Sequence, residues 1–158
     1  PMKRSFVFAT LVVLVFVAVG SASAQSDPRI GTWKINLVKS KSSAGPMPAS
    51  QTRTYEAQGS EIMATTETVD AKGNHTTQHY NATADGKDYP TGPANGGTTI
   101  SIKLLGPGSY AGTMKKDGKV TSTNRAIISD GGKTFTFTTK GTNAQGQKFT
   151  SVVVFDKE

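Results

Sequence analysis

The alternation of phenylalanine and threonine near the C-terminus constrains the fold more than any other feature. The segment Thr134–Thr139 reads Thr-Phe-Thr-Phe-Thr-Thr, and a period of two is typical of a β-strand with one buried face. A turn at Asp130–Lys133 precedes it, and a second turn at 141–147 leads into a closing strand, Lys148–Asp156. Strands joined by turns of Gly, Asn and Asp predict antiparallel hairpins. The region Ile127–Lys157 therefore predicts the unit from which the whole chain is built.

Weaker copies of this unit fill the upstream sequence. Further strands are predicted at Ile30–Val38, Thr52–Gln58, Glu61–Val69, His75–Thr83, Thr98–Leu105, Tyr110–Lys115 and Val120–Ile128. Segment 39–50 is rich in Ser, Gly and Pro and predicts a crossing loop, and Asp85–Pro90 is interpreted as a turn. Nine or ten strands with short connections predict an all-β fold, a single up-and-down antiparallel β-barrel without open edges. An outer-membrane barrel is disfavoured, because only 8% of residues are aromatic.

The N-terminal segment 1–24 has the pattern of a Sec-type signal peptide. Lys3 and Arg4 precede an apolar run from Phe6 to Val19, and Ala22-Ser23-Ala24 predicts cleavage before Gln25. The alternative is a transmembrane anchor, but the apolar run is short for a bilayer. We expect residues 25–158 to form one exported domain with no membrane span, located in the periplasm or outside the cell.

Composition narrows the range of partners. The chain has no cysteine, so disulfide bonds are excluded. Its net charge of +7 falls to +5 without Lys3 and Arg4, and the remaining lysines are scattered over predicted turns. A nucleic-acid-binding protein would gather basic and aromatic residues on one face, so we expect no nucleic-acid partner. No pattern indicates a cofactor, and we expect a monomer or a weak homo-oligomer.

Two segments at the ends of the predicted barrel resemble the calycins, the group of lipocalins and fatty-acid-binding proteins. Gly31-Thr32-Trp33-Lys34 resembles the Gly-x-Trp segment that opens their first strand, which implies that Trp33 plugs one barrel end. The closing segment Val152–Lys157 is similar to the last strand of the fatty-acid-binding proteins. More closely, the chain resembles small exported bacterial lipocalin-like proteins without an established function. The segments that carry this likeness are Gly31–Asn36, Gly86–Pro90 and Lys140–Gln147.

The chain also departs from the fatty-acid-binding proteins at two places. They hold a carboxylate with an Arg-x-Tyr pair near the end of the chain, where this sequence has Val153 and Phe155. They carry a helical lid after the first strand, for which segment 39–50 is too short and too rich in proline. The resemblance therefore implies a barrel of about eight to ten strands but no particular ligand.

Five polar and aromatic residues are the candidates for a ligand site inside the barrel. A barrel of this size can hold one small molecule, and convergent polar groups in an apolar pocket fix its orientation. We therefore predict a small apolar or amphipathic ligand. The alternative is that these side chains point outward and pair with Glu56, Glu67 or Asp70. The candidates are Arg53, Tyr55, His79, Tyr80 and Arg125.

The two histidines leave a catalytic alternative open but no metal site. His75 and His79 share a strand face yet lie about 13 Å apart, too far to ligate one ion by themselves. An enzyme of the hydrolase or isomerase type would use His79 as a general base at the barrel mouth. A third hypothesis is a structural or envelope-interaction protein that uses its outer face. No motif identifies a nucleophilic triad.

Overall fold

The computed structural model describes residues 27–92 and 96–158, and about two thirds of them belong to one antiparallel sheet. The predicted signal peptide and the cleavage before Gln25 lie outside the described residues. The strands are β1 (Gly31–Ile35), β2 (Lys41–Ser42), β3 (Ser50–Gln58), β4 (Glu61–Val69), β5 (His75–Ala82), β6 (Asp85–Pro90), β7 (Thr98–Gly106), β8 (Ser109–Lys116), β9 (Lys119–Ser129), β10 (Thr134–Thr142) and β11 (Lys148–Lys157), with a 3-10 turn at Asp130–Gly132. No described helix is long and apolar enough to cross a bilayer.

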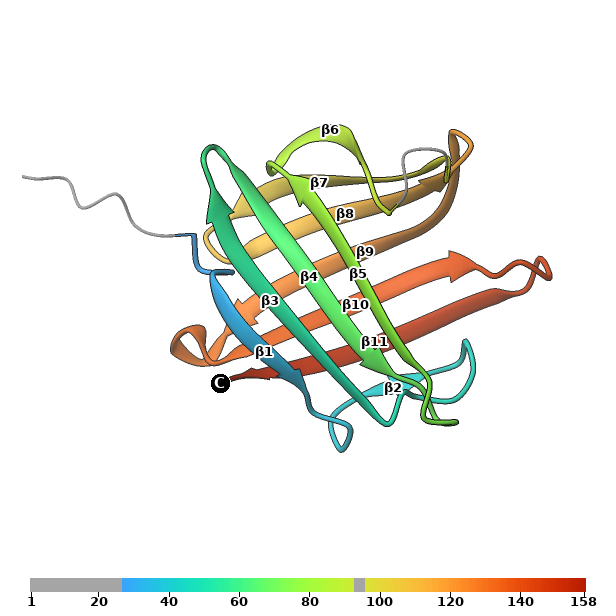
Figure 1. Ribbon diagram of the computed structural model, residues 1–158. Coiled ribbons are helices and arrows are strands. Elements are labelled where there is room, and N and C mark those ends of the chain that lie inside the picture. The colour runs from blue at the N-terminus through green and yellow to red at the C-terminus, as the bar shows by residue number, and fades with distance from the viewer. Residues whose placement is uncertain (1–26, 93–95) are drawn as a thin grey trace, which may run out of the picture.

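The sheet curls into a nearly closed barrel because its first strand joins its last. Its order is β5-β4-β3-β1-β11-β10-β9-β8-β7-β6, with β2 added beside β11. Trp33 of β1 faces Arg53 on one side and Lys157 on the other. Figure 1 shows β3, β4 and β5 crossing in front of the strands from β7 to β11. The predicted union of the Trp33 and Phe155 strands is confirmed, since Ile35 pairs with Phe155.

The remaining edges, β5 and β6, come together without a continuous ladder. The chain turns between them at Thr83 and Ala84, and the backbone N–H of Leu104 on β7 donates to the Ala84 carbonyl at 3.2 Å. Thr83 and Tyr89 also share a hydrogen bond between their hydroxyl groups. The all-β, up-and-down prediction is therefore confirmed, with this one narrow seam in the wall.

Two predicted elements are wrong in detail. Asp85–Pro90 is strand β6 and not a turn, because it pairs with β7 around a bulge between Asp85 and Asp88. Gly86 permits the bulge with a φ of +84°, and Pro90 needs no ladder donor at the end of an edge strand. Strand β1 ends at Ile35, since the Asn36 side chain accepts from the Lys39 N–H at 3.0 Å and turns the chain. Leu37 is exposed and does not share the face of Trp33.

The core fills one end of the barrel, which we call the closed end. Trp33, Phe135 and Phe155 are fully buried there, and the Trp33 and Phe135 rings meet edge to face at 5.1 Å. Burying each of these side chains contributes about 1.5–3 kcal/mol. The opposite end, formed by segment 36–49 and the turns after β4, β6, β8 and β10, is the open end.

Residues just before β1 cover the closed end. Arg29 is 4% exposed and binds the Asp27 carboxylate with both Nε and Nη2, at 2.9 and 2.7 Å. Its guanidinium lies over the Tyr110 ring at 4.6 Å, and its carbonyl accepts from Trp33 Nε1 at 2.7 Å. The Tyr110 hydroxyl donates to Asp27 at 3.3 Å. These contacts satisfy the polar groups of the core aromatics, as burial requires.

A half-open cavity as the candidate ligand site

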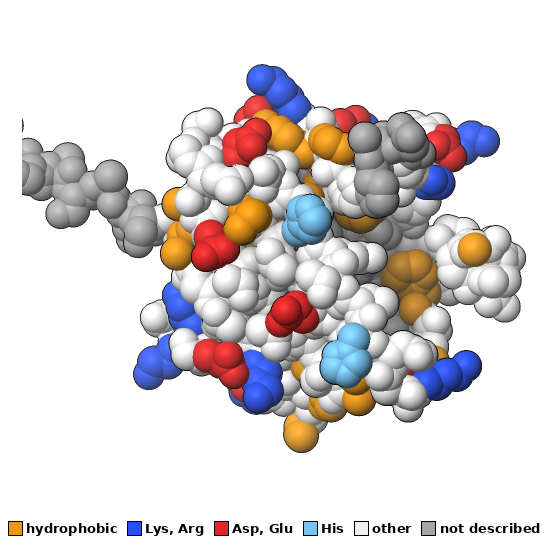
Figure 2. All heavy atoms as spheres, in the orientation of Figure 1, with side chains coloured by type: hydrophobic (Ala, Val, Ile, Leu, Met, Phe, Trp, Pro, Cys, Tyr) orange, Lys and Arg blue, Asp and Glu red, His pale blue; other side chains and the backbone are white. Residues whose placement is uncertain are grey.

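A cavity of about 1220 Å³ occupies the barrel between the core and the open end. All the long strands contribute to its wall, and residues 44–48 of the β1–β3 connection line its mouth. In Figure 2 the surface is hollowed on the right, beside the projecting turn that joins β10 and β11. Pockets for small organic ligands commonly span about 300–1,000 Å³, so the space exceeds what one such molecule needs.

The half of the cavity next to the closed end is apolar. Inward positions of the strands place aromatic and branched side chains there, because alternate residues of each strand face the interior. Phe135 and Phe137 stack with ring centroids 4.3 Å apart, and Tyr55 lies 5.8 Å from Phe135. The other apolar side chains of this half include Ile35, Ile100, Ile102, Ala126 and Val153.

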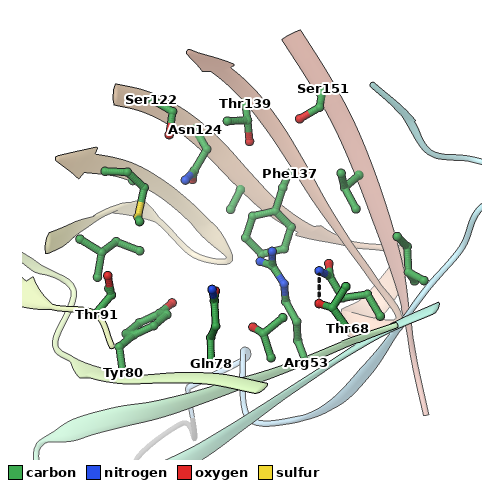
Figure 3. A pocket seen from close by; sticks show the side chains of 18 of the residues that line it. Arg53, Thr68, Gln78, Tyr80, Thr91, Ser122, Asn124, Phe137, Thr139 and Ser151 are labelled. Atoms are coloured by element: carbon green, nitrogen blue, oxygen red, sulfur yellow. Dashed lines mark hydrogen bonds between the residues drawn. The ribbon is translucent and has the colours of Figure 1, made fainter. Parts of the chain in front are cut away.

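The half next to the open end carries mainly hydroxyl and amide groups, with Met47 and Met114 as apolar neighbours. Figure 3 shows these side chains converging on the space from opposite walls. Most are free to bond water or a ligand, although Gln51 Nε2 donates to Thr68 Oγ1 at 2.9 Å. The change from apolar to polar along one set of inward faces makes the cavity amphipathic. Its polar residues include Thr66, Thr68, Thr76, Gln78, Ser122, Asn124, Thr139 and Ser151.

Arg53 stands at the boundary between the two halves. Its guanidinium lies 4.5 Å from the centre of the Phe137 ring and 4.8 Å from that of Phe155. Its Nε atom is buried and has no hydrogen-bond partner. None of the ion pairs in the described part of the chain involves it, and none of the described residues that line the cavity is acidic. The cavity therefore contains a positive charge that has aromatic faces beside it and no acidic partner among the described lining residues.

Tyr80 and Tyr110, two tyrosines that line the cavity, have raised pKa values. Burial raises the pKa of Tyr80, and the nearby Tyr55 adds to this effect, while the charges of Arg53 and Arg29 only partly oppose it. At the base of the cavity, burial raises the pKa of Tyr110 to about 12, and the charge of Asp27 raises it further. Each phenol can therefore donate a hydrogen bond at neutral pH.

The structure brings three of the five predicted site residues together and leaves two outside. Arg53, Tyr55 and Tyr80 point into the cavity. Strand β5 borders the cavity at His79, but this residue is exposed, and its imidazole lies on the outer face because neighbouring Tyr80 points inward. Both histidines are visible on that outer face in Figure 2. The placement of His79 inside the barrel is therefore corrected.

Arg125 is also outside the cavity. It is exposed on β9 between the inward-facing Asn124 and Ala126, and its Nη2 donates to Ser109 Oγ at 3.2 Å. The alternative prediction was that outward-pointing side chains pair with Glu56, Glu67 or Asp70. None of the ion pairs in the described part of the chain links Arg125 to an acidic residue. Arg125 is therefore an exposed arginine on the outer face, whereas Arg53 lines the cavity.

Sequence reasoning missed most of the polar wall and the role of Arg29. The wall residues are ordinary Thr, Ser, Asn and Gln, which carry no motif. They could have been identified only by knowing which alternate residues of each strand face the interior. Arg29 lines the base of the cavity although it precedes the first strand. In the described part of the chain, no three His, Asp or Glu side chains gather as a metal ion would require.

Comparison with known proteins adds little beyond the fold. No protein-family model and no curated protein matches the chain. The chain is similar to a crystal structure of the zebrafish ileal bile-acid-binding protein complexed with cholic acid, with 13% identity and a TM-score of 0.49, over 83% of this chain and 99% of that one. It is also similar to the siderocalin Ex-FABP, with 10% identity and a TM-score of 0.39, over 83% and 71% of the two chains.

The protein is an all-β, nearly closed antiparallel barrel. Its ten-stranded meander, its Gly-Thr-Trp-Lys first strand and the pairing of β1 with β11 agree with the resemblance predicted from the sequence. Likenesses as distant as these two say nothing about the ligand of this chain. The chemistry of the cavity therefore has to be taken from its own residues.

Proposed function

We propose that the protein binds one small amphipathic molecule inside its barrel. The observation that carries the proposal is the amphipathic cavity, apolar beside Phe137 and Ile100 and polar beside Asn124 and Thr139. An apolar ligand portion gains roughly 25 cal/mol for each Å² that it buries in the first half. Hydroxyl and amide groups of the second half then orient the polar portion.

We further propose that binding takes place in the periplasm or outside the cell. The signal-peptide pattern of residues 1–24 supports this location. The outward position of His79 removes the residue on which an enzymatic alternative depended, and the cavity favours ligand binding over a purely structural role.

Titration with the neutral fluorophore N-phenylnaphthylamine tests the proposal. We expect one-to-one binding with a rise in probe emission, since the apolar half shields the probe from water. Trp33 is the only tryptophan and lies buried below the cavity, so energy transfer from Trp33 to the probe reports binding inside the barrel. Absence of binding, or binding without loss of Trp33 emission, would contradict the proposal.

Two neighbouring threonines on β4 provide a matched control. Thr66 lines the cavity, whereas Thr65 pairs with His79 on the outer face. Thr66→Trp places an indole in the cavity and should weaken probe binding about threefold or more, and Thr65→Trp should leave it unchanged. Since both variants add one tryptophan, probe emission is the readout. Equal effects of the two substitutions would place the probe outside the barrel.

A further inference from the structure

The interior cation points to the chemical class of the ligand, and this inference rests on the proposed binding function. We infer that the ligand carries an anionic head group, a carboxylate or a group of similar charge and shape, which pairs with Arg53. Arg53 lies on β3 and lines the cavity.

The guanidinium of Arg53 has no acidic partner in the cavity wall. An arginine side chain carries a positive charge in proteins, and that of Arg53 is partly shielded from water. Its Nε is buried without a hydrogen-bond partner, and two phenylalanine rings are the compensation that the described residues supply. A buried, unsatisfied charged donor is costly. An anion bound beside Arg53 would pair with its charge, because a guanidinium can donate two parallel hydrogen bonds to a carboxylate.

Arg53 lies among other side chains that can donate hydrogen bonds. Gln78 and Tyr80 on β5 point into the cavity from the same side as Arg53, as Figure 3 shows. The phenol of Tyr80 is protonated, so it can donate to an anion but carries no charge to repel one. An anionic head group would thus meet one cation and two neutral polar groups. Its apolar portion would lie along Phe137 and Ile100.

The two ends of the barrel differ in charge, and this observation is independent of the interior. The connections at the open end, with the strand residue on either side of each, carry six lysines and two aspartates: Lys39, Lys41, Lys72, Lys116, Lys119 and Lys148 against Asp70 and Asp117. At the closed end, the same count gives Arg29, Lys133 and Lys157 against Asp27, Glu61, Asp85, Asp130 and Glu158. Lys39 pairs with Asp156 at 3.7 Å, and the other five lysines, predicted to be scattered, still outnumber the two aspartates at the open end. Such a field attracts anions toward the opening.

Two probes with the same aromatic skeleton test the inference. Anilinonaphthalene sulfonate carries an anionic group that N-phenylnaphthylamine lacks, so their affinity ratio isolates the head group. For the unmodified protein we expect the sulfonate to bind more tightly. In Arg53→Met this preference should fall by about tenfold or more, the loss expected for a hydrogen-bonded charge, while the neutral probe changes less than about threefold. Arg125→Met, on the outer face, is the matched control and should leave both affinities unchanged.

Each other result contradicts the inference in a recognisable way. Equal preference before and after Arg53→Met would show that the cavity binds ligands without regard to charge, and the proposed function would survive. Loss of both probes in a variant that still unfolds cooperatively would make Arg53 a structural residue. Failure of the unmodified protein to bind either probe would overturn the proposed function itself. If Arg53→Met does not fold, Arg53→Gln serves in its place, and Arg53→Lys should restore much of the preference because it keeps the charge.

Discussion

Arg29 is a buried arginine and Arg53 a half-buried one in the same barrel, and they differ in whether an acidic side chain pairs with them. Both stack on aromatic rings, Arg29 on Tyr110 and Arg53 on Phe137 and Phe155. Arg29, however, is bound by the Asp27 carboxylate through two hydrogen bonds, whereas Arg53 has no acidic neighbour in the cavity. The closed end thus contains a completed ion pair and the cavity contains half of one.

This difference separates a residue that holds the fold together from one that is available to a ligand. Removing one member of a buried pair leaves the other charge without its partner, so the loss in stability is large. Removing an unpaired, partly buried charge leaves no partner behind, and the lost aromatic contact is offset by the relief of desolvation. The two arginines should therefore respond in opposite ways to the same substitution.

The largest effect is expected for Arg29→Met. Because Asp27 would lose its partner and the Tyr110 and Trp33 contacts would lose their support, we expect the free energy of unfolding to fall by about 3 kcal/mol. Asp27 is 28% exposed in its side chain, which keeps the loss at the lower end of the range for buried pairs. Urea unfolding measures it. A loss no greater than that of Arg53→Met would break the distinction between the two sites.

A smaller effect follows from pH. Burial alone would raise the pKa of Asp27, but the side-chain and backbone hydrogen bonds of Arg29 and its charge outweigh burial and lower the pKa below 3.8. A carboxyl with a lowered pKa stabilises the fold above its unfolded-state pKa, and this contribution disappears as pH falls through the folded-state value. The free energy of unfolding should therefore decrease below about pH 4. Asp27→Asn should make this decrease shallower, and an unchanged slope would contradict the role of the pair.

The smallest effect on stability is expected for Arg53→Met. Methionine fills similar space beside Phe137, so the free energy of unfolding should change by less than about 1 kcal/mol and can increase. Urea unfolding of Arg53→Met and of the surface control Arg125→Met should give values within about 1 kcal/mol of each other. A loss of several kcal/mol in Arg53→Met alone would make Arg53 a structural residue like Arg29.

How much the sequence could predict depended on the hydrophobic phase of each strand. In β10 the alternation of Phe135 and Phe137 with threonine fixes which side faces inward, and the predicted hairpin with β11 is correct. Strand β5 reads His-Thr-Thr-Gln-His-Tyr-Asn-Ala and offers no such phase. Predicting His79 and Tyr80 on the same side conflicted with the alternation itself, because adjacent strand residues face opposite sides.

Strand β9 shows the same difficulty with Arg125. Its apolar residues Ala126, Ile127 and Ile128 are consecutive, so the sequence does not say which of them is inside. The structure buries Ala126 and leaves Ile127 42% exposed, which turns Arg125 outward with Ile127. Ile128 shares the phase of Ala126 and packs against the core, so each of the two phases would turn one isoleucine inward. Pairing across the barrel decides the phase, and pairing is a property of the whole sheet.

The position of a bound probe is the most direct test of the central claim that the barrel interior is the binding site. Amide chemical shifts from NMR would be followed during titration with N-phenylnaphthylamine. We predict that the changes concentrate at inward positions such as Arg53, Ile100, Asn124 and Phe137. Changes that gather on outer-face residues such as Val120 and Ile127, or no changes at saturating probe, would contradict the account.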